Sequence, residues 1–410
     1  MRLAEVIESA VGRRAPLEFT AYDGSRTGDR NAPVRIELRS PLALSYLASA
    51  PGELGLARAY VSGALDIHGD MYEALSSVAR TTVVEHVPAR TFAQVALRLG
   101  LSRLWWPVKP PAAEARVHGR RHSKQRDQEA ISHHYDVSNR FYEYVLGPSM
   151  AYTCAVYPTD DASLEEAQWT KHDLVARKLG LREGMRLLDV GCGWGGMVMH
   201  AARHYGVRAL GVTLSRKQAE WAQKKIAETG LSDLAEVRHL DYRDVKEGDF
   251  DAVSSIGLTE HIGEAALPAY FRSLYDKLRP GGRLLNHCIT RANNLQDSRV
   301  KGFIGRYVFP DGELEGPGRI ISEIHDVGFE VRHEENFREH YAKTLTAWCA
   351  NLDEHWTEAV EEVGEERARV WRLYMAGSRL GFEINNIQLH QVLAVRLDDT
   401  NAHMPLRPDW

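Results

Sequence analysis

The chain has 410 residues, enough for two domains or for one large domain with sizeable additions. Hydrophobic residues make up 44% and charged residues 26%, as is usual for a globular protein, and the formal charge of −5 gives no general case for nucleic-acid binding. No stretch reaches the roughly 18 uninterrupted apolar residues of a membrane-spanning helix and the N-terminus lacks a signal-peptide core, so we expect a cytoplasmic protein.

Compositional breaks predict three parts of the chain. They divide it into an N-terminal domain at residues 1–97, a basic linker at 98–126 and a larger C-terminal domain at 127–410. The linker has eight Lys or Arg against one acid, Glu114, and three prolines that interrupt any helix. One interpretation is a solvated basic linker. The other uses Trp105 and Trp106, whose rings favour membrane interfaces, together with the cations, which favour an anionic bilayer surface.

From residue 185 onward, strand-like and helix-like segments alternate. This alternation predicts an α/β fold with a parallel sheet and helices on both faces. Pro280-Gly281-Gly282 should end the helical pattern that begins at residue 266. Runs at 329–337 and 388–396 could complete the sheet after a helical stretch at about 338–380. The expected strands lie at 186–193, 209–215, 236–241, 250–257 and 282–289.

The segment "LLDVGCGWGG" (187–196) predicts a strand followed by a glycine-rich turn that opens a helix. Such a turn brings a ligand close to the backbone and to the helix N-terminus. Dinucleotide-binding folds use a related pattern, and a turn without a ligand is the alternative. The spacing Gly191, Gly193, Gly195 after Asp189 is the form found in S-adenosylmethionine methyltransferases.

Two further strand ends carry candidate cofactor ligands. The strand ending in "GVTLSRKQ" has no acid for a ribose, so Thr213, Ser215 and Gln218 must supply polar contacts. The next strand ends in "HLDYRD", which places Asp241 and Tyr242 at the crevice. An aromatic ring there can stack on adenine and a carboxylate can accept from its amino group, although half-buried packing would also explain Tyr242.

The segment "SSIGLTEHIG" (254–263) places a carboxylate and an imidazole directly after an apolar strand. Open α/β sheets form their ligand crevices at this end of a strand. Glu260 is therefore a candidate site residue, and a first-turn helix acid is the alternative. We interpret His261 as a structural neighbour. No metal site or disulfide framework is indicated, because the four cysteines are widely separated and form no C-x-x-C pair.

From about residue 120 to the C-terminus, the chain resembles the cyclopropane fatty acid synthases and mycolic acid methyltransferases. The first 120 residues resemble the extra domain of the longer bacterial members, most clearly at "GELGLARAYVSGALDIHGD". The resemblance implies that residues 1–97 are an accessory, lipid-associated domain and that 127–410 are the catalytic domain. The fold implied is a Rossmann-like class I S-adenosylmethionine methyltransferase with helical additions. The segments that carry the resemblance are "HHYDVSNRFYEYVLGPSMAYTCAVYP", "LLDVGCGWGG", "GVTLSRKQ", "DYRD", "IGLTEHIG", "LLNHCIT" and "HYAKTL".

The resemblance implies transfer of the methyl group of S-adenosylmethionine to the double bond of an unsaturated acyl chain. A carbocation then loses a proton to a bound bicarbonate. The bicarbonate ligands of the family map onto Cys154, through its backbone, and onto Glu260, His287, Ile289 and Tyr341. Tyr152 and Thr153 would touch the methionine part of the cofactor. Tyr135 would face the site from a helix that closes over the cofactor.

The sequence resembles most closely actinobacterial members that make 10-methylene-stearoyl chains, precursors of tuberculostearic acid. A cyclopropane ring is the alternative product. The expected partners are acyl chains of phospholipids at the inner face of the membrane and a flavin-dependent reductase that saturates the product; homo-oligomerisation stays open. A small-molecule methyltransferase would share the glycine turn without needing Glu260, His287 and Tyr341. A catalytically dead lipid-binding protein should have lost cofactor or bicarbonate ligands.

Overall fold

The structure is a computed structural model whose chain forms two compact units. The first consists of Met1–Ala115, Lys301–Val308 and Trp356–Leu380, and the second of Arg116–Val300, Phe309–His355 and Gly381–Trp410. Trp105, Trp106 and Tyr135 fall outside the described residues. These are residues 2–11, 16–50, 52–81, 108–115, 119, 121–124, 126–127, 129, 138–295 and 298–410.

The first unit contains a small sheet with strand order β2-β1-β3-β4. The pair β1 and β3 is parallel, whereas β1–β2 and β3–β4 are antiparallel. Its elements are α1 (Leu3–Val11), β1 (Glu18–Ala21), β2 (Arg26–Gly28), β3 (Arg35–Leu38), α2 (Pro41–Ser49), α3 (Glu53–Val61), β4 (Leu65–His68), α4 (Met71–Thr81), α13 (Gly302–Tyr307), α16 (Trp356–Val363) and α17 (Glu365–Glu383).

Polar contacts join the three stretches of chain in this first unit. The Phe303 N–H donates to Glu53 Oε1 at 3.2 Å, at the start of α13. Arg369 of α17 donates to Asp66 Oδ1 at 3.0 Å. The predicted domains follow the chain without interruption, whereas this compact unit also takes in two segments from the predicted catalytic range.

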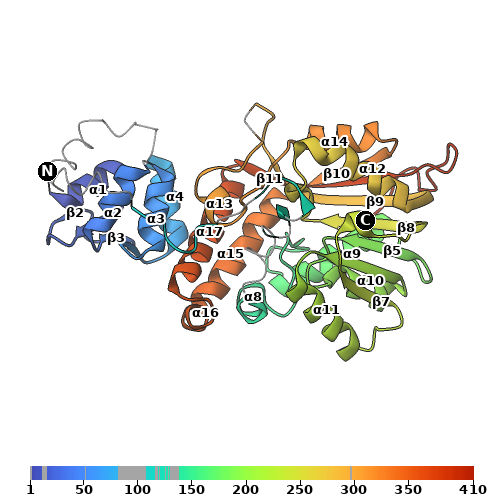
Figure 1. Cartoon of the computed structure of the whole chain (residues 1–410), viewed down its shortest axis with the longest axis horizontal. Helices are drawn as coiled ribbons and strands as arrows, with labels where there is room; N and C mark the ends of the chain where they lie inside the picture. Colours follow the sequence, from blue (N-terminus) through green and yellow to red (C-terminus); the bar gives the residue numbers. More distant parts are fainter. Residues whose placement is uncertain are drawn as a thin grey trace. The chain divides into compact units, whose positions relative to one another are not determined.

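The second unit is built on a seven-stranded sheet with the order β10-β11-β9-β8-β5-β6-β7 (Figure 1). Its strands are β5 (Arg186–Val190), β6 (Arg208–Thr213), β7 (Ala235–His239), β8 (Phe250–Ile256), β9 (Leu278–Arg291), β10 (Glu330–Asn336) and β11 (Ile387–Val395). Its helices are α8 (Asn139–Leu146), α9 (Leu164–Leu179), α10 (Gly196–Tyr205), α11 (Arg216–Glu228), η1 (Tyr242–Asp244), η2 (Thr259–His261), η3 (Glu264–Ala266), α12 (Leu267–Lys277), α14 (Pro317–Asp326) and α15 (Arg338–Glu354).

The sheet is mixed, and not wholly parallel as the alternation of elements predicts. Strands β9, β8, β5, β6 and β7 are parallel, but β11 pairs antiparallel with both β9 and β10. The difference arises because β11 returns between β9 and β10. The predicted helix stop is also placed too late, since α12 ends at Lys277 and Pro280-Gly281-Gly282 lies within β9.

Alternation along each strand gives the sheet two apolar faces. Leu187 belongs to one core and its neighbour Leu188 to the other, as expected for side chains that point to opposite faces. Figure 1 shows α10 and α11 on one side of the sheet and α12 and α14 on the other. Both faces are covered, so the edge where the strands end is left for a site.

Three basic residues of the predicted linker form ion pairs within the second unit. Arg121 and Arg126 both pair with Asp311, at 3.1 and 2.6 Å, and Lys124 pairs with Asp244 at 2.6 Å. These residues are therefore not a purely solvated segment. In the part of the chain that the structure describes, no helix has the length and apolar character needed to cross a bilayer.

Candidate active site

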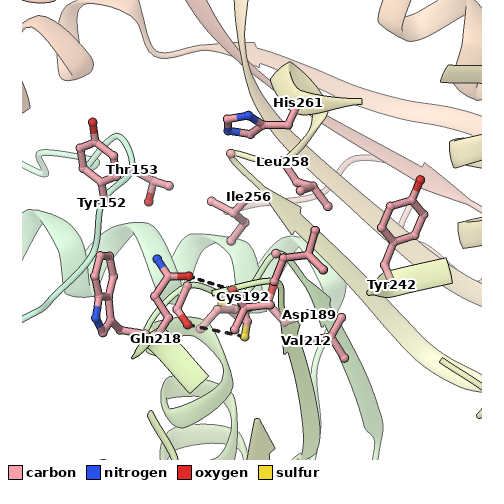
Figure 2. A pocket seen from close by; sticks show the side chains of 18 of the residues that line it. Tyr152, Thr153, Asp189, Cys192, Val212, Gln218, Tyr242, Ile256, Leu258 and His261 are labelled. Carbon is pink, nitrogen blue, oxygen red and sulfur yellow. Dashed lines mark hydrogen bonds between the residues drawn. The ribbon is translucent and has the colours of Figure 1, made fainter. Parts of the chain in front are cut away.

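The carboxyl ends of β5, β6 and β8 border a cavity of about 120 Å³. Figure 2 shows Tyr152 and Thr153 on one side of this cavity and Tyr242 on the other, with Asp189 and Cys192 between them. The structure thus brings together most of the predicted cofactor residues. Those that line the cavity are Tyr152, Thr153, Asp189, Gly191, Gly193, Thr213, Gln218 and Tyr242.

The glycine turn has the predicted strand–turn–helix form. β5 ends at Val190, and α10 begins at Gly196 with Gly195 as its N-cap. Gly191 has a φ of +73°, and a Cβ added there would lie 3.1 Å from the Leu258 side chain. A larger residue would therefore strain the backbone and close the space beside the cavity. Gly195 is not among the cavity residues and serves as the helix cap.

Asp189 is the second-last residue of β5, the strand that leads into this turn. It is 2% exposed, and its Oδ1 accepts a hydrogen bond from Ser254 of β8 at 2.6 Å. Burial raises the pKa of this carboxyl to about 7. The Ser254 bond fixes the carboxyl in the cavity wall, where a polar ligand group can reach it.

The residues after β6 form a small hydrogen-bonded group. Thr213 Oγ1 donates to Gln218 Oε1 at 2.8 Å, which orients the Gln218 amide at the cavity. Ser215 is fully buried, and its Oγ accepts from the Gln218 N–H at 3.2 Å as the N-cap of α11. Ser215 is therefore in a supporting position, whereas Thr213 and Gln218 face the cavity.

Tyr242 and Asp241 are placed differently. Tyr242 lines the cavity, and its ring packs edge-on against Tyr270 with centroids 5.1 Å apart. Asp241 does not line it. Its Oδ1 and Oδ2 accept from the Arg243 guanidinium at 2.8 and 2.6 Å, and Arg243 itself borders the cavity. Contact of Asp241 with an adenine remains a prediction.

Lysine 171 is a buried cation in the cavity wall. Its side chain comes from α9, is 1% exposed and donates to Thr153 Oγ1 at 2.7 Å. One turn earlier, Gln168 Nε2 donates to the Thr153 carbonyl at 2.9 Å. Desolvation lowers the pKa of Lys171 to about 8. Helix α9 thus fixes the Thr153 backbone and side chain together.

The five predicted bicarbonate ligands do not line this cavity, but their segments meet beside it. The Gly257 N–H at the end of β8 donates to the His287 carbonyl at 2.8 Å. The Cys154 thiol, between Thr153 and α15, donates to Ala155 O at 3.2 Å and contacts Phe337 O at 3.7 Å. Tyr341 follows on α15, where its buried ring packs on Phe382 with centroids 4.5 Å apart.

Glu260 lies in η2, the short helix that follows the end of β8. β8 ends at Ile256, the chain turns into η2, and Glu260 Oε1 accepts the Ile289 N–H of β9 at 2.6 Å. The other oxygen, Oε2, is buried and has no hydrogen-bond partner among the described residues. Burial raises the pKa of Glu260 to about 7. The alternative of a helix-start acid does not account for this orphan oxygen.

His287 lies two residues before Ile289 on the same face of β9. It is fully buried, its Nδ1 is 3.1 Å from Gln391 Nε2, and its Nε2 has no partner within the described part of the chain. Burial, with Lys171 and Lys178 nearby, lowers the pKa of His287 well below its ordinary value. The ring is therefore neutral, and one of its nitrogens needs a ligand.

Sequence reasoning missed several residues at the site. Lys171 could have been found, because a charged residue here occupies a position in α9 between the buried Ala167 and Leu174. Arg243 and Asp127 also border the cavity and form an ion pair of 2.9 Å, which no motif predicts. His261 lines the cavity too, and its ring packs edge-on against Phe309 at 5.4 Å.

A mixed seven-stranded sheet with a glycine turn after β5 and a cavity at the strand ends is the fold of the class I S-adenosylmethionine-dependent methyltransferases. A solved structure of mycolic acid cyclopropane synthase CmaA1 in complex with SAH and CTAB has this fold. It superposes with a TM-score of 0.62 at 32% identity, over 65% of this chain and 98% of that chain. Residues 122–392 match the family described as mycolic acid cyclopropane synthetase, and the chain belongs to this family.

Two relatives match along nearly their whole lengths. A probable fatty acid methyltransferase of Mycobacterium tuberculosis is 57% identical over 423 residues, covering 100% of this chain and 98% of the relative. A probable fatty acid methyltransferase of Pseudomonas putida is 38% identical over 401 residues, covering 96% of this chain and 95% of the relative. The similarity therefore includes the N-terminal residues that precede the family match.

Proposed function

We propose that this protein is an S-adenosylmethionine-dependent fatty acid methyltransferase that methylates the double bond of an unsaturated acyl chain. The substrate class is supported by the two full-length relatives, both described as probable fatty acid methyltransferases. The cofactor is supported by the cavity at the glycine turn and by the family fold. The acyl chain would belong to a membrane phospholipid at the inner face of the membrane.

One observation carries the mechanism: beside the cofactor cavity, two buried polar atoms, one an acceptor and one a ring nitrogen that can donate, have no hydrogen-bond partner among the residues that the structure describes. Glu260 Oε2 can only accept a hydrogen bond when ionised, and a neutral His287 has one ring nitrogen left to satisfy. Bicarbonate fits this donor set, because it offers an O–H to the carboxylate and an oxyanion to an imidazole N–H. When bound, bicarbonate would supply the base that takes the proton from the added methyl group.

The protein's own residues would then do three things. Glu260 accepts and His287 donates, which together orient the anion. The Ile289 N–H holds Glu260 in place through Oε1 at 2.6 Å. The burial of Glu260, His287 and Tyr341 excludes water, which would otherwise quench a carbocation and weaken each polar contact. Cys154 and Tyr341 complete the proposed binding set, in which Ile289 takes part through the N–H that holds Glu260.

The product we propose is a 10-methylene-stearoyl chain. After methyl transfer, hydride moves from the methylated carbon to the cationic neighbour, and loss of a methyl proton leaves a C=CH2 branch. A flavin-dependent reductase would saturate it on the way to tuberculostearic acid. If the methyl proton is lost without the hydride shift, the electron pair of that C–H bond closes a cyclopropane ring. The cyclopropane ring is the alternative product, because a similar solved structure is described as a cyclopropane synthase.

The test uses the purified full chain, carbon-13 methyl-labelled S-adenosylmethionine and vesicles of dioleoyl phosphatidylglycerol. The lipids are converted to methyl esters and analysed by mass spectrometry and carbon-13 NMR. We expect label in a vinylidene carbon. Label in a ring carbon would establish the cyclopropane product. Label-free lipid, together with turnover on a soluble amine, would overturn the acyl-chain proposal in favour of a small-molecule methyltransferase.

A further inference from the structure

A line of hydrogen-bonded polar side chains, buried as far as Lys178, leads away from His287 on the side opposite Nε2, the nitrogen with no partner among the described residues. His287 Nδ1 is 3.1 Å from Gln391 Nε2, and Gln391 Oε1 is 2.8 Å from Lys178 Nζ. Lys178 Nζ also lies 2.6 Å from Glu335 Oε2. The side chain of Lys178 is fully buried, and Gln391 is 1% exposed. Four elements, β9, β11, α9 and β10, thus converge on one line of hydrogen bonds.

Lys178 fixes the direction of the hydrogen bonds between itself, Gln391 and His287. An ammonium group has only donors, so the Gln391 atom facing Lys178 must be the amide oxygen. The amide nitrogen therefore faces His287 and donates to it. The register holds this geometry, because Gln391 of β11 pairs directly with His287 of β9 and their side chains share one face of the sheet.

The direction of the bonds decides which nitrogen of His287 carries the proton. A ring nitrogen that accepts from Gln391 has a lone pair and no proton, so in the neutral ring Nε2 carries the hydrogen. That Nε2–H is the buried atom without a partner among the described residues. It needs an acceptor, and Glu260 Oε2 nearby on the strand-end turn needs a donor.

We infer that Gln391 is a positioning residue that, oriented by Lys178, holds His287 in the Nε2–H tautomer and thereby makes it an obligatory donor to a bound oxyanion. The inference rests on the proposed function for the identity of that anion. It adds that His287 does not act as the base, since its remaining lone pair is already engaged by Gln391. Glu335 keeps Lys178 in place at the far end of the line.

The variant Gln391→Glu reverses the direction of the hydrogen bond at His287 Nδ1. A carboxylate beside Nδ1 accepts instead of donating, so the proton moves to Nδ1 and Nε2 presents a lone pair to the anion. The control is Gln388→Glu, the same chemical change on the same strand, where the side chain contacts Asn385 and lies away from His287. Both proteins are first checked for folding by circular dichroism and for cofactor affinity by calorimetry.

Nitrogen-15 NMR of histidine-labelled full-length protein measures the tautomer directly, with His287→Gln used to assign the signal. We expect a protonated Nε2 in the wild type and in Gln388→Glu, and a protonated Nδ1 in Gln391→Glu. A wild-type His287 protonated at Nδ1 overturns the inference, whether or not the variant folds. An unchanged tautomer in a folded Gln391→Glu protein overturns it as well.

Bicarbonate dependence of turnover separates this inference from the proposed function. If both hold, Gln391→Glu raises the bicarbonate concentration needed for half-maximal turnover by roughly tenfold to a hundredfold, as expected for a lost charge-assisted hydrogen bond. The Gln388→Glu value should match that of the wild type. If wild-type turnover does not respond to bicarbonate in a carbonate-depleted buffer, the proposed base is wrong. The tautomer of His287 is still decided by the NMR spectrum, which does not depend on turnover.

Discussion

The cofactor cavity and the pair formed by Glu260 and His287 lie at the ends of neighbouring strands, but they prepare for ligands in different ways. The cavity is an open space beside a backbone turn, where Gly191 leaves room and Asp189 is already bonded to Ser254. Glu260 and His287 are buried, and each keeps one buried polar atom that has no partner in the described part of the chain. The cavity provides space for the cofactor, whereas Glu260 and His287 provide hydrogen-bonding groups for a second ligand. Mutations in the first region should therefore affect cofactor binding, and mutations in the second should affect turnover.

The largest expected effect comes from Glu260→Gln. The amide keeps the size of the carboxyl but loses the charge that fixes an O–H donor, so turnover should fall by about 10²- to 10³-fold, as for other transition-state polar contacts. Affinity for S-adenosylmethionine, measured by calorimetry, should stay within the error of the wild type. Unchanged turnover would remove Glu260 from the mechanism and would end the contrast between the two regions.

The next largest effect is a loss of cofactor affinity, expected from Gly191→Ala. The added Cβ would lie 3.1 Å from Leu258 in a residue with a φ of +73°, so we expect cofactor affinity to fall by about tenfold through local strain and lost space. Gly184→Ala is the matched control, because its φ is +81° and an added Cβ meets no atom within 4 Å. Equal loss of affinity in both variants would assign the effect to the backbone and not to the cavity.

A smaller effect, on stability, is expected from Lys171→Met. The pKa of this buried ammonium is lowered from 10.5 to about 8, so at pH 7 its burial opposes folding by about 3 kcal/mol. Losing the hydrogen bond to Thr153 costs about 1 kcal/mol. The variant should therefore raise the free energy of unfolding by about 2 kcal/mol at pH 7 in the absence of cofactor, as measured by urea denaturation.

The pH dependence gives this stability prediction its sign. Between pH 8 and 10.5 the unfolded chain holds the Lys171 proton and the folded protein does not, so wild-type stability rises with pH relative to the variant. The advantage of Lys171→Met should shrink across that range. Lys224→Met, at a lysine whose side chain is 78% exposed, should show no such trend. A destabilised Lys171→Met protein at pH 7 would contradict the account of Lys171 as a costly cation.

The smallest effect concerns the acyl substrate and lies outside both regions. Replacing Trp105 and Trp106 by alanine should weaken binding to dioleoyl phosphatidylglycerol vesicles severalfold, because indole rings favour the bilayer interface. Co-sedimentation measures the bound fraction, and Trp169→Ala, at a 48% exposed ring of α9, is the control. Unaltered sedimentation of the double variant would return residues 98–126 to a plain basic linker.

Much of the sheet and the cofactor cavity could be predicted from sequence because both depend on local patterns. Alternating apolar runs place β5 to β9, and the glycine spacing of the turn after β5 is contained within ten residues of sequence. The antiparallel direction of β11 and the ion pair between Asp127 and Arg243 depend on chain segments that meet only after folding. Gln391 escaped notice for the same reason, since it is 104 positions from the histidine that it orients.

The first compact unit is assembled from three separate stretches of chain, and this has a consequence for the order of synthesis. Its earliest strand, β1, leaves the ribosome long before α16 and α17, which supply the last stretch of the same unit, Trp356–Leu380. Strands β5 to β10 are all made in the interval. The part of the protein that is begun first is therefore finished almost last, and a fragment cut after residue 120 would lack three of its own helices.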